Sequence, residues 1–288
     1  MVALRVVQPG KGAKRALVVV YHLTSEIDAA LRAAVGGTPA VLNHTAPVED
    51  GKATTGGAYF RVGQKGLRPM GELLELALQK TGAQVLSPVL LCGFSEGAQA
   101  PRAHLTAGED AHGIVAVDGI HGTWPTPEPF QVDPWRNYFS RAKAGERVWV
   151  ATCSQIPTAS DAPAKTPVRL MLEKITGWGL GVGSKVEPFA LGQSQARVYS
   201  YAGKDAAAHV YQAKTVLPSA VREALERLGV SLEPGTGPGG GGLPEPDPVS
   251  EPPKTSSLEQ GFLERAGVVM VLTGLVAAGR ETYSWVKG

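Results

Sequence analysis

A single serine stands between two glycines in the stretch LLCGFSEGAQA, residues 90–100. Ser95 follows a short apolar run, with Gly93 two residues before it and Gly97 two residues after it. A Gly-x-Ser-x-Gly between a strand and a helix is typical of a nucleophile elbow, whose strained backbone leaves room only for very small residues at those two places. The helix that follows directs its first amide groups toward the serine, which favours an oxyanion there. The pattern predicts either a reactive serine or a simple tight strand-to-helix turn.

Further polar residues also come directly after apolar runs. Asp118 follows GIVAV, Cys153 ends RVWVATC, and the segment after Tyr201 begins at the end of the run ARVYSYAG. The carboxyl ends of parallel strands meet at one edge of a sheet, and sites form at that edge. We therefore expect these residues to share one edge with Ser95.

The elements that must hold these residues alternate between short apolar runs and longer helical patterns. The predicted strands cover residues 15–22, 38–46, 88–94, 113–119, 147–153 and 196–203. The predicted helices cover residues 25–36, 71–82, 166–177 and 217–229, with another directly after Ser95. Continuous apolar strands separated by helices indicate a parallel sheet covered on both faces. The expected fold class is α/β, with a mostly parallel, doubly wound sheet.

The composition changes once, after residue 230. Residues 232–254 are dominated by Gly, Pro and acidic residues without apolar periodicity, which predicts a linker. We expect a domain over residues 1–230, a Pro/Gly-rich linker over 231–256 and an apolar C-terminal helix over 257–288. The uncharged core of that helix, residues 266–279, is shorter than the roughly 20 residues of a comfortable membrane span. A helix that packs on a partner and a membrane-associated tail are the two interpretations.

Charge and cysteine usage restrict the class of protein. The formal net charge is +2 and no block of Lys and Arg occurs, so we expect no nucleic-acid partner. Cys92 and Cys153 lie in apolar runs and are expected to be buried thiols of a reducing compartment. The N-terminus has no signal-peptide pattern. We expect a cytoplasmic protein, with association to a membrane or a virion through residues 257–288 as the alternative.

Residues 15–229 combine three features: an alternating order of strands, loops and helices, the GFSEG elbow, and a histidine after the last strand. The chain resembles the α/β-hydrolase superfamily, in the form of a serine esterase with a small cap or none. The resemblance implies that Ser95 is the nucleophile and His209 the general base. It also implies a carboxylate partner for the histidine. Asp118 is favoured, and Asp161, after the next strand, is the alternative.

The resemblance further implies an oxyanion hole made of two amides. Glu96, the residue after the serine, supplies one. The other comes from the loop after the first strand, where Leu23 replaces the glycine common in the family, and Thr24 is the alternative donor. We expect the pocket to be lined by residues that follow strands at the same edge: His22, His121 and Trp124.

The stretch between Asp118 and Arg147 is rich in aromatic residues and allows only a small cap. Its aromatic side chains predict an apolar wall over the serine or packing in the core. Core packing is favoured for Tyr138 and Phe139, and the candidates for the wall are Trp124, Phe130 and Trp135.

The histidines at strand ends also raise the question of a metal. His22, His44 and His121 are expected at the same rim as Asp118, and zinc sites can be assembled from such a set. However, the sequence has no His-Glu-x-x-His or paired-cysteine spacing. We expect no metal and no other cofactor.

These features together predict a serine hydrolase that cleaves an ester, in preference to a peptide bond, through an acyl-enzyme. The expected substrate is a small-molecule or cell-envelope ester. The alternative is a non-catalytic scaffold with a hydrolase-like fold, which the proline-rich spacer and the apolar terminal segment favour. In both interpretations residues 257–288 are expected to bind a membrane or a protein assembly.

Overall fold

The computed structural model describes ten segments of the chain, which are residues 4–21, 25–44, 48–49, 52–53, 62–63, 67–123, 126–156, 165–166, 168–233 and 243–248. The chain divides by its internal contacts into two units, Met1–Val249 and Ser250–Gly288. All described residues belong to the first unit.

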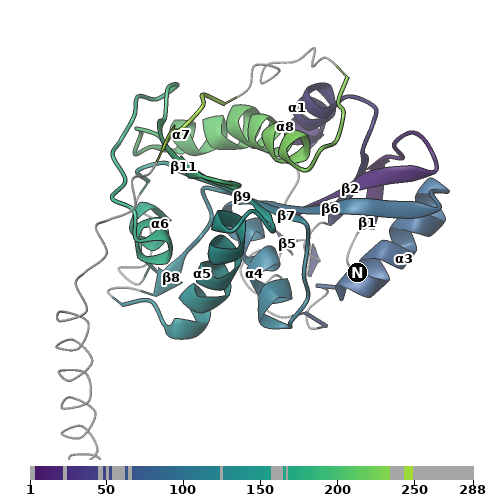
Figure 1. The fold of residues 1–288 in the computed structure, drawn as a ribbon, viewed down its shortest axis with the longest axis horizontal. Coiled ribbons are helices and arrows are strands. Elements are labelled where there is room, and N and C mark those ends of the chain that lie inside the picture. The colour runs from purple at the N-terminus through teal and green to yellow at the C-terminus, as the bar shows by residue number, and fades with distance from the viewer. Residues whose placement is uncertain are drawn as a thin grey trace, which may run out of the picture. The chain divides into compact units, whose positions relative to one another are not determined.

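The described residues of this unit form a central nine-stranded sheet (Figure 1), whose strand order is β1-β3-β2-β6-β7-β9-β12-β11-β13. Its six central strands are mutually parallel: β3 (Ala40–His44), β2 (Lys14–Tyr21), β6 (Val85–Phe94), β7 (Gly113–Val117), β9 (Val148–Cys153) and β12 (Ala196–Ser200). The flanking strands β1 (Leu4–Gln8) and β11 (Phe189–Gln193) are antiparallel to their neighbours β3 and β12. The prediction of a mostly parallel α/β sheet is confirmed.

Helices cover both faces of the sheet (Figure 1). One face carries α1 (Ser25–Val35) and α8 (Leu217–Arg227), and the other carries α3 (Met70–Thr81), α4 (Gln99–Thr106), α5 (Pro129–Lys143) and α6 (Val168–Thr176). Strand β2 shows why both layers are needed. Its Leu17 and Val19 belong to one buried cluster and Val18 and Val20 to the other, because successive side chains of a strand point to opposite faces.

Helix α5 was not predicted, and it changes the role expected for one aromatic residue. Glu128 and Gln131 form a capping box at its start, and Pro129 occupies the first helical position. Trp135, Tyr138 and Phe139 are all buried in the core, so the wall expected of Trp135 is wrong. These three residues recur at helical spacing, but Pro129, Pro134 and the polar residues between them make the stretch look like a loop in the sequence. Phe130 is 61% exposed, and Trp124 lies outside the described residues.

Two short antiparallel pairs stand apart from the main sheet. Strand β8 (Gly122–Thr123) pairs with β10 (Lys165–Thr166), and β4 (Val48–Glu49) pairs with β5 (Lys52–Ala53). In the first pair, β8 follows β7 in the chain and β10 follows β9, so both strands come after the carboxyl ends of strands of the main sheet.

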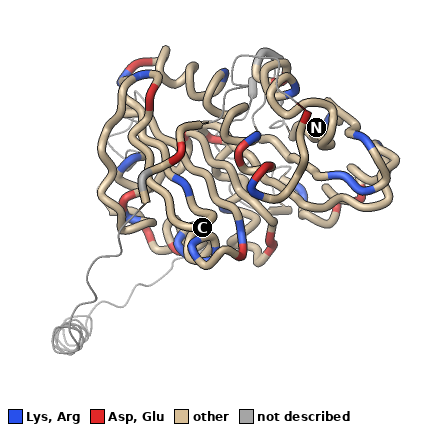
Figure 2. The backbone as a smooth tube through the Cα atoms, turned by 45° about the horizontal axis from the view of Figure 1, so that its top comes forward, with Lys and Arg blue, Asp and Glu red and all other residues tan. Residues whose placement is uncertain are grey.

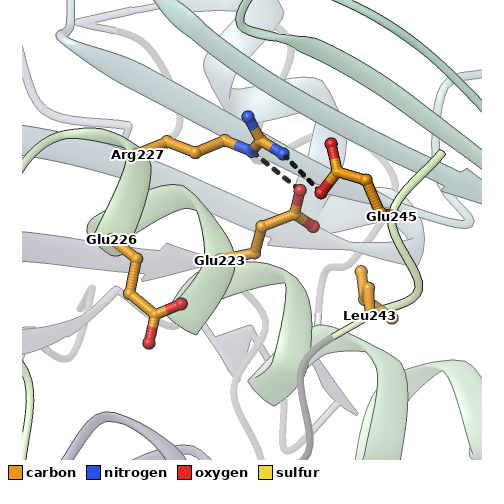
Figure 3. Close-up of a pocket in the computed structure, with 5 residues that line it drawn as sticks. All are labelled: Glu223, Glu226, Arg227, Leu243 and Glu245. Carbon is orange, nitrogen blue, oxygen red and sulfur yellow. Dashed lines mark hydrogen bonds and ion pairs between the residues drawn. The ribbon is translucent and has the colours of Figure 1, made fainter. Parts of the chain in front are cut away.

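Residues 243–248, which we name the C-terminal strap, lie on the sheet although they fall within the predicted linker. Their strand β13 (Asp247–Pro248) pairs with β11. Glu245 forms ion pairs with Arg197 at 3.2 Å and with Arg227 at 3.7 Å. Figure 3 shows Arg227 between Glu245 and Glu223, in a pocket of about 350 Å³ that the strap shares with α8. Residues 234–242 and 249–288, with the predicted C-terminal helix, lie outside the described residues.

Charged residues of both signs are interspersed along the described chain (Figure 2). Among the described residues, no helix is long and apolar enough to cross a membrane.

Candidate active site

Strand β6 ends at Phe94, and the chain turns sharply at Ser95. The φ angle of Ser95 is 53°, in the left-handed region that residues with side chains rarely adopt. A Cβ atom added at Gly93 would lie 2.4 Å from the carbonyl oxygen of Gly97. Residues Ser95–Ala98 form one turn of 3₁₀ helix that leads directly into α4. The predicted sharp turn is therefore present. Residue 93 must be glycine because the backbone of Gly97 approaches it closely.

Asp118 and His209 are brought together at the same edge of the sheet. Asp118 is the first residue after β7 and is 3% exposed. His209 lies on α7 (Ala206–Tyr211), the short helix after β12, and its side chain is 32% exposed. Its Nδ1 atom is 2.7 Å from Oδ2 of Asp118, although the two residues are 91 positions apart. A buried carboxylate therefore orients a partly exposed imidazole.

The turn that contains Ser95 packs against His209 through Phe94 and against the residue that follows Asp118. The ring of His209 packs on Phe94, the residue before the serine, with centroids 4.4 Å apart. The acid's turn packs against the serine from another side, since a Cβ atom added at Gly119 would lie 2.0 Å from the carbonyl oxygen of Ser95. The side chain of Gln99 ties this turn to α4 by donating to the carbonyl of Gly119 at 2.7 Å. The elbow, the acid and the histidine form one packed unit.

Two residues that sequence reasoning missed complete the surroundings of the pair. Ser154 donates to Asp118 twice, from its backbone N–H to Oδ1 at 2.9 Å and from its hydroxyl to Oδ2 at 2.7 Å. Gln155 holds the loop before α7, donating from its side chain to the carbonyl of Tyr201 at 3.1 Å and from its N–H to that of Gly203 at 2.9 Å. The sequence shows only that both residues directly follow the apolar run that ends at Cys153. That run forms β9, the neighbour of the strand that precedes Asp118.

The remaining predicted residues divide between the described and the undescribed parts of the chain. Glu96 lies in the 3₁₀ turn after Ser95, and His121 is half-buried just before β8. Asp205, four residues before His209, is the N-cap of α7, and its carboxylate accepts from the N–H of Ala208 at 2.9 Å. The other predicted site residues lie outside the described residues: His22, Leu23, Thr24, Trp124 and Asp161.

The described residues contain no group of three or more His, Cys, Asp or Glu side chains that could hold a metal ion. His44, one of the histidines considered for zinc, is buried at the end of β3 with its ring 5.2 Å from that of Tyr21.

A second buried histidine fixes the end of β2, directly before the loop expected to supply an oxyanion donor. His104 of α4 lies 2.7 Å from the hydroxyl of Tyr21 through Nε2 and 2.6 Å from Glu109 through Nδ1. Burial lowers the pKa of His104, and the hydrogen bond with Glu109 acts in the opposite direction. This chain of contacts joins β2 to the helix that follows the elbow.

The elbow at the end of a central parallel strand is followed in the chain by the acid's turn and then by the histidine's helix. This order, on a sheet covered by helices on both faces, is that of the α/β hydrolases. The chain has the α/β-hydrolase fold.

No known family model matches the chain, and no curated protein matches it. Among solved structures it is similar to TT1662 from Thermus thermophilus, with 16% identity, a TM-score of 0.43 and coverage of 79% of this chain and 92% of that one. The siderophore hydrolase EstB from Aspergillus nidulans gives 15% identity, a TM-score of 0.43 and coverage of 77% and 86%. Est1E from Butyrivibrio proteoclasticus gives 9% identity, a TM-score of 0.41 and coverage of 79% and 94%.

Proposed function

We propose that the chain is a serine hydrolase that cleaves an ester bond, with Ser95 as nucleophile, His209 as general base and Asp118 as the carboxylate partner of the base. The observation that carries the proposal is the 2.7 Å hydrogen bond between Asp118 and His209, beside a strained serine at a strand-to-helix turn. An imidazole whose Nδ1 donates to a carboxylate has an unprotonated Nε2, which is able to accept the proton of a serine hydroxyl.

The reaction follows from these positions. The Oγ of Ser95 attacks the ester carbonyl carbon while its proton passes to Nε2 of His209, and Asp118 stabilises the resulting imidazolium. The tetrahedral intermediate collapses, the C–O bond to the alcohol breaks, and the alcohol leaves with the proton from Nε2. A water molecule then attacks the acyl-enzyme in the same way and releases the carboxylic acid and free Ser95.

The oxyanion of each tetrahedral intermediate needs hydrogen-bond donors. Glu96, which directly follows the serine in the elbow turn, provides one backbone N–H in this proposal, and Leu23 or Thr24 provides the other. The first amides of a helical turn have no intrahelical acceptor, so the amide of Glu96 suits this role.

We also propose the substrate class and the attachment of the enzyme. The substrate is a small-molecule or cell-envelope ester, since esters are the commonest substrates of this fold by analogy. The pocket is lined in part by His22, His121 and Trp124. Residues 257–288 tether the enzyme to a membrane or a protein assembly, and the support for this is the Pro/Gly-rich composition of residues 232–254 followed by an apolar segment.

Labelling with a fluorophosphonate probe tests the proposal, because such probes phosphonylate only activated serines. Wild-type protein should be labelled, with the adduct located on Ser95 by mass spectrometry, and labelling should be lost in Ser95→Ala and in His209→Ala. Ser140→Ala is the matched control, since Ser140 is exposed on α5 and donates to the carbonyl of Arg136 within that helix. It should be labelled like the wild type. Absence of labelling in folded wild-type protein would reject the hydrolase and favour the scaffold.

A further inference from the structure

Ser154 directs both of its hydrogen-bond donors at one carboxylate. Its backbone N–H binds Oδ1 of Asp118 and its hydroxyl binds Oδ2, the same oxygen that faces Nδ1 of His209. Ser154 is 2% exposed and Asp118 is 3% exposed, so water has little access to these contacts.

We infer that Ser154 is a positioning residue of the site: it holds the carboxylate of Asp118 in the one orientation that keeps Oδ2 on His209. This inference rests on the proposed function of Ser95, His209 and Asp118. It assigns to Ser154 a part in catalysis that is exerted through Asp118, without contact with the substrate.

The carboxylate of Asp118 needs such support because it is buried. Loss of hydrogen bonds to a buried carboxylate is costly, and the last torsion of an aspartate side chain is broad when packing alone restrains it. Two donors on two different oxygens fix the plane of the carboxylate. Because the hydroxyl of Ser154 and the imidazole share Oδ2, a rotation that breaks the contact with one also disturbs the contact with the other.

The strand order explains how Ser154 reaches this position. Strands β7 and β9 are neighbours with Val117 opposite Thr152, and the N–H of Asp118 donates to the carbonyl of Thr152 at 3.0 Å. The chain after β9 therefore passes directly beside the acid. The resemblance to α/β hydrolases places a carboxylate after this strand in many members, whereas this chain has Cys153, Ser154 and Gln155 there. Ser154 occupies that place and acts on a carboxylate supplied by the neighbouring strand.

The same strand end also holds the element that carries the base. Gln155 binds the loop before α7, and the hydroxyl of Thr152 donates to the side chain of the buried Gln212 at 2.7 Å, one residue after α7 ends. Asp118 and the helix that carries His209 are therefore both held by the residues at the end of strand β9. This matters because a misplacement of about 1 Å in a catalytic group can cost about a hundredfold in rate.

Substitution of Ser154 separates the role of its hydroxyl from that of its backbone. In Ser154→Ala we expect kcat for p-nitrophenyl acetate and the rate of fluorophosphonate labelling to fall about ten- to a hundredfold, with KM unchanged. Ser154→Thr keeps the hydroxyl and should recover most of the rate. If Ser154→Ala does not fold, Ser154→Cys, which retains the volume but has only a weak donor, provides the same test. Ser219→Ala is the control: Ser219 is 4% exposed on α8 and donates to the carbonyl of Thr215.

A double-substitution cycle distinguishes positioning from a general effect on the fold. If Ser154 acts through Asp118, Ser154→Ala should cost less than about twofold when Asp118→Asn is already present. The same loss in both backgrounds would overturn the inference, and so would wild-type kcat in Ser154→Ala.

A measurement that needs no turnover keeps the inference separate from the proposed function. The proton on Nδ1 of His209 should give a downfield NMR resonance in the wild type and in Ser154→Thr, and it should be shifted or broadened in Ser154→Ala. A wild type that shows this resonance but is not labelled would reject the proposed function alone. An unchanged resonance in Ser154→Ala would reject the positioning role, whether or not the protein is labelled.

Discussion

At the scale of single residues, the carboxylate of Asp118 is the centre of the candidate site. Three donors converge on it: the N–H and the hydroxyl of Ser154, and Nδ1 of His209. An asparagine in its place would direct its N–H₂ group at a donor of His209 or of Ser154. The hydrogen bond to that donor would be lost. The tautomer of His209 that the proposed reaction requires would no longer be favoured.

Asp118→Asn should therefore lower kcat for ester hydrolysis roughly 10³- to 10⁴-fold while the protein stays folded. Steady-state kinetics with p-nitrophenyl acetate and circular dichroism measure the two effects. Asp205→Asn is the matched control, because Asp205 is close to His209 in sequence and Asn is an equally good N-cap for α7. It should retain the wild-type rate. A large loss in Asp161→Asn with little loss in Asp118→Asn would reverse the choice between the two candidate acids.

Part of this site can be predicted from the sequence, for a physical reason. Ser95, Asp118 and His209 each follow an apolar run, and the carboxyl ends of parallel strands meet at one edge. Ser154 and Gln155 also follow such a run, but their partners depend on which strands are neighbours and in what register. A polar residue after a strand therefore marks the edge of the sheet without showing what it binds.

At the scale of elements, the elbow depends on how closely the turn after β7 approaches the turn after β6. A methyl group at Gly119 would meet the carbonyl oxygen of Ser95 at 2.0 Å and the Cβ of Ala98 at 2.6 Å. The atom at 2.0 Å belongs to the backbone of Ser95 itself, so no side chain can move aside to relieve the clash.

Gly119→Ala should consequently displace the elbow, lower the free energy of unfolding by about 1–3 kcal/mol and abolish fluorophosphonate labelling. Gly71→Ala is the matched control. Gly71 lies in α3, where an added Cβ meets nothing within 4 Å, and the change should stabilise the protein by about 0.5–1 kcal/mol. Thermal unfolding and labelling measure both variants. Labelling of Gly119→Ala at the wild-type rate would show that the packing of the two turns does not set the serine's position.

The central strands and most helices were predictable because their apolar residues recur in continuous runs or at helical spacing. Helix α5 was not, since Pro129 and Pro134 suggest a loop although the first is a favourable first residue and the second is tolerated within the helix. The flanking strands β1 and β11 escaped prediction for a different reason. Both are short and antiparallel to the central strands, and only two residues separate the end of β11 from its antiparallel partner β12.

At the scale of the whole molecule, the C-terminal strap decides where the folded unit ends. Pro246 and Arg197 are both buried at the strap, and Glu245 is paired with Arg197. The strap pairs with β11, beyond β12, whereas Ser95 follows β6 near the middle of the sheet. Loss of the strap is therefore expected to affect stability, and not the chemistry.

Two truncated chains separate the strap from the segment after it. Residues 1–249 should unfold at the temperature of the full chain, and residues 1–242 should unfold about 2–8 °C lower, because Arg197 loses a partner and the surface under Pro246 is exposed. Both should be labelled on Ser95. If residues 257–288 are a tether, the 1–249 chain should also lose its cellular location while it keeps its activity on small esters. Equal unfolding temperatures for both truncations would place the end of the folded unit before the strap, and an unchanged location for 1–249 would reject the tether.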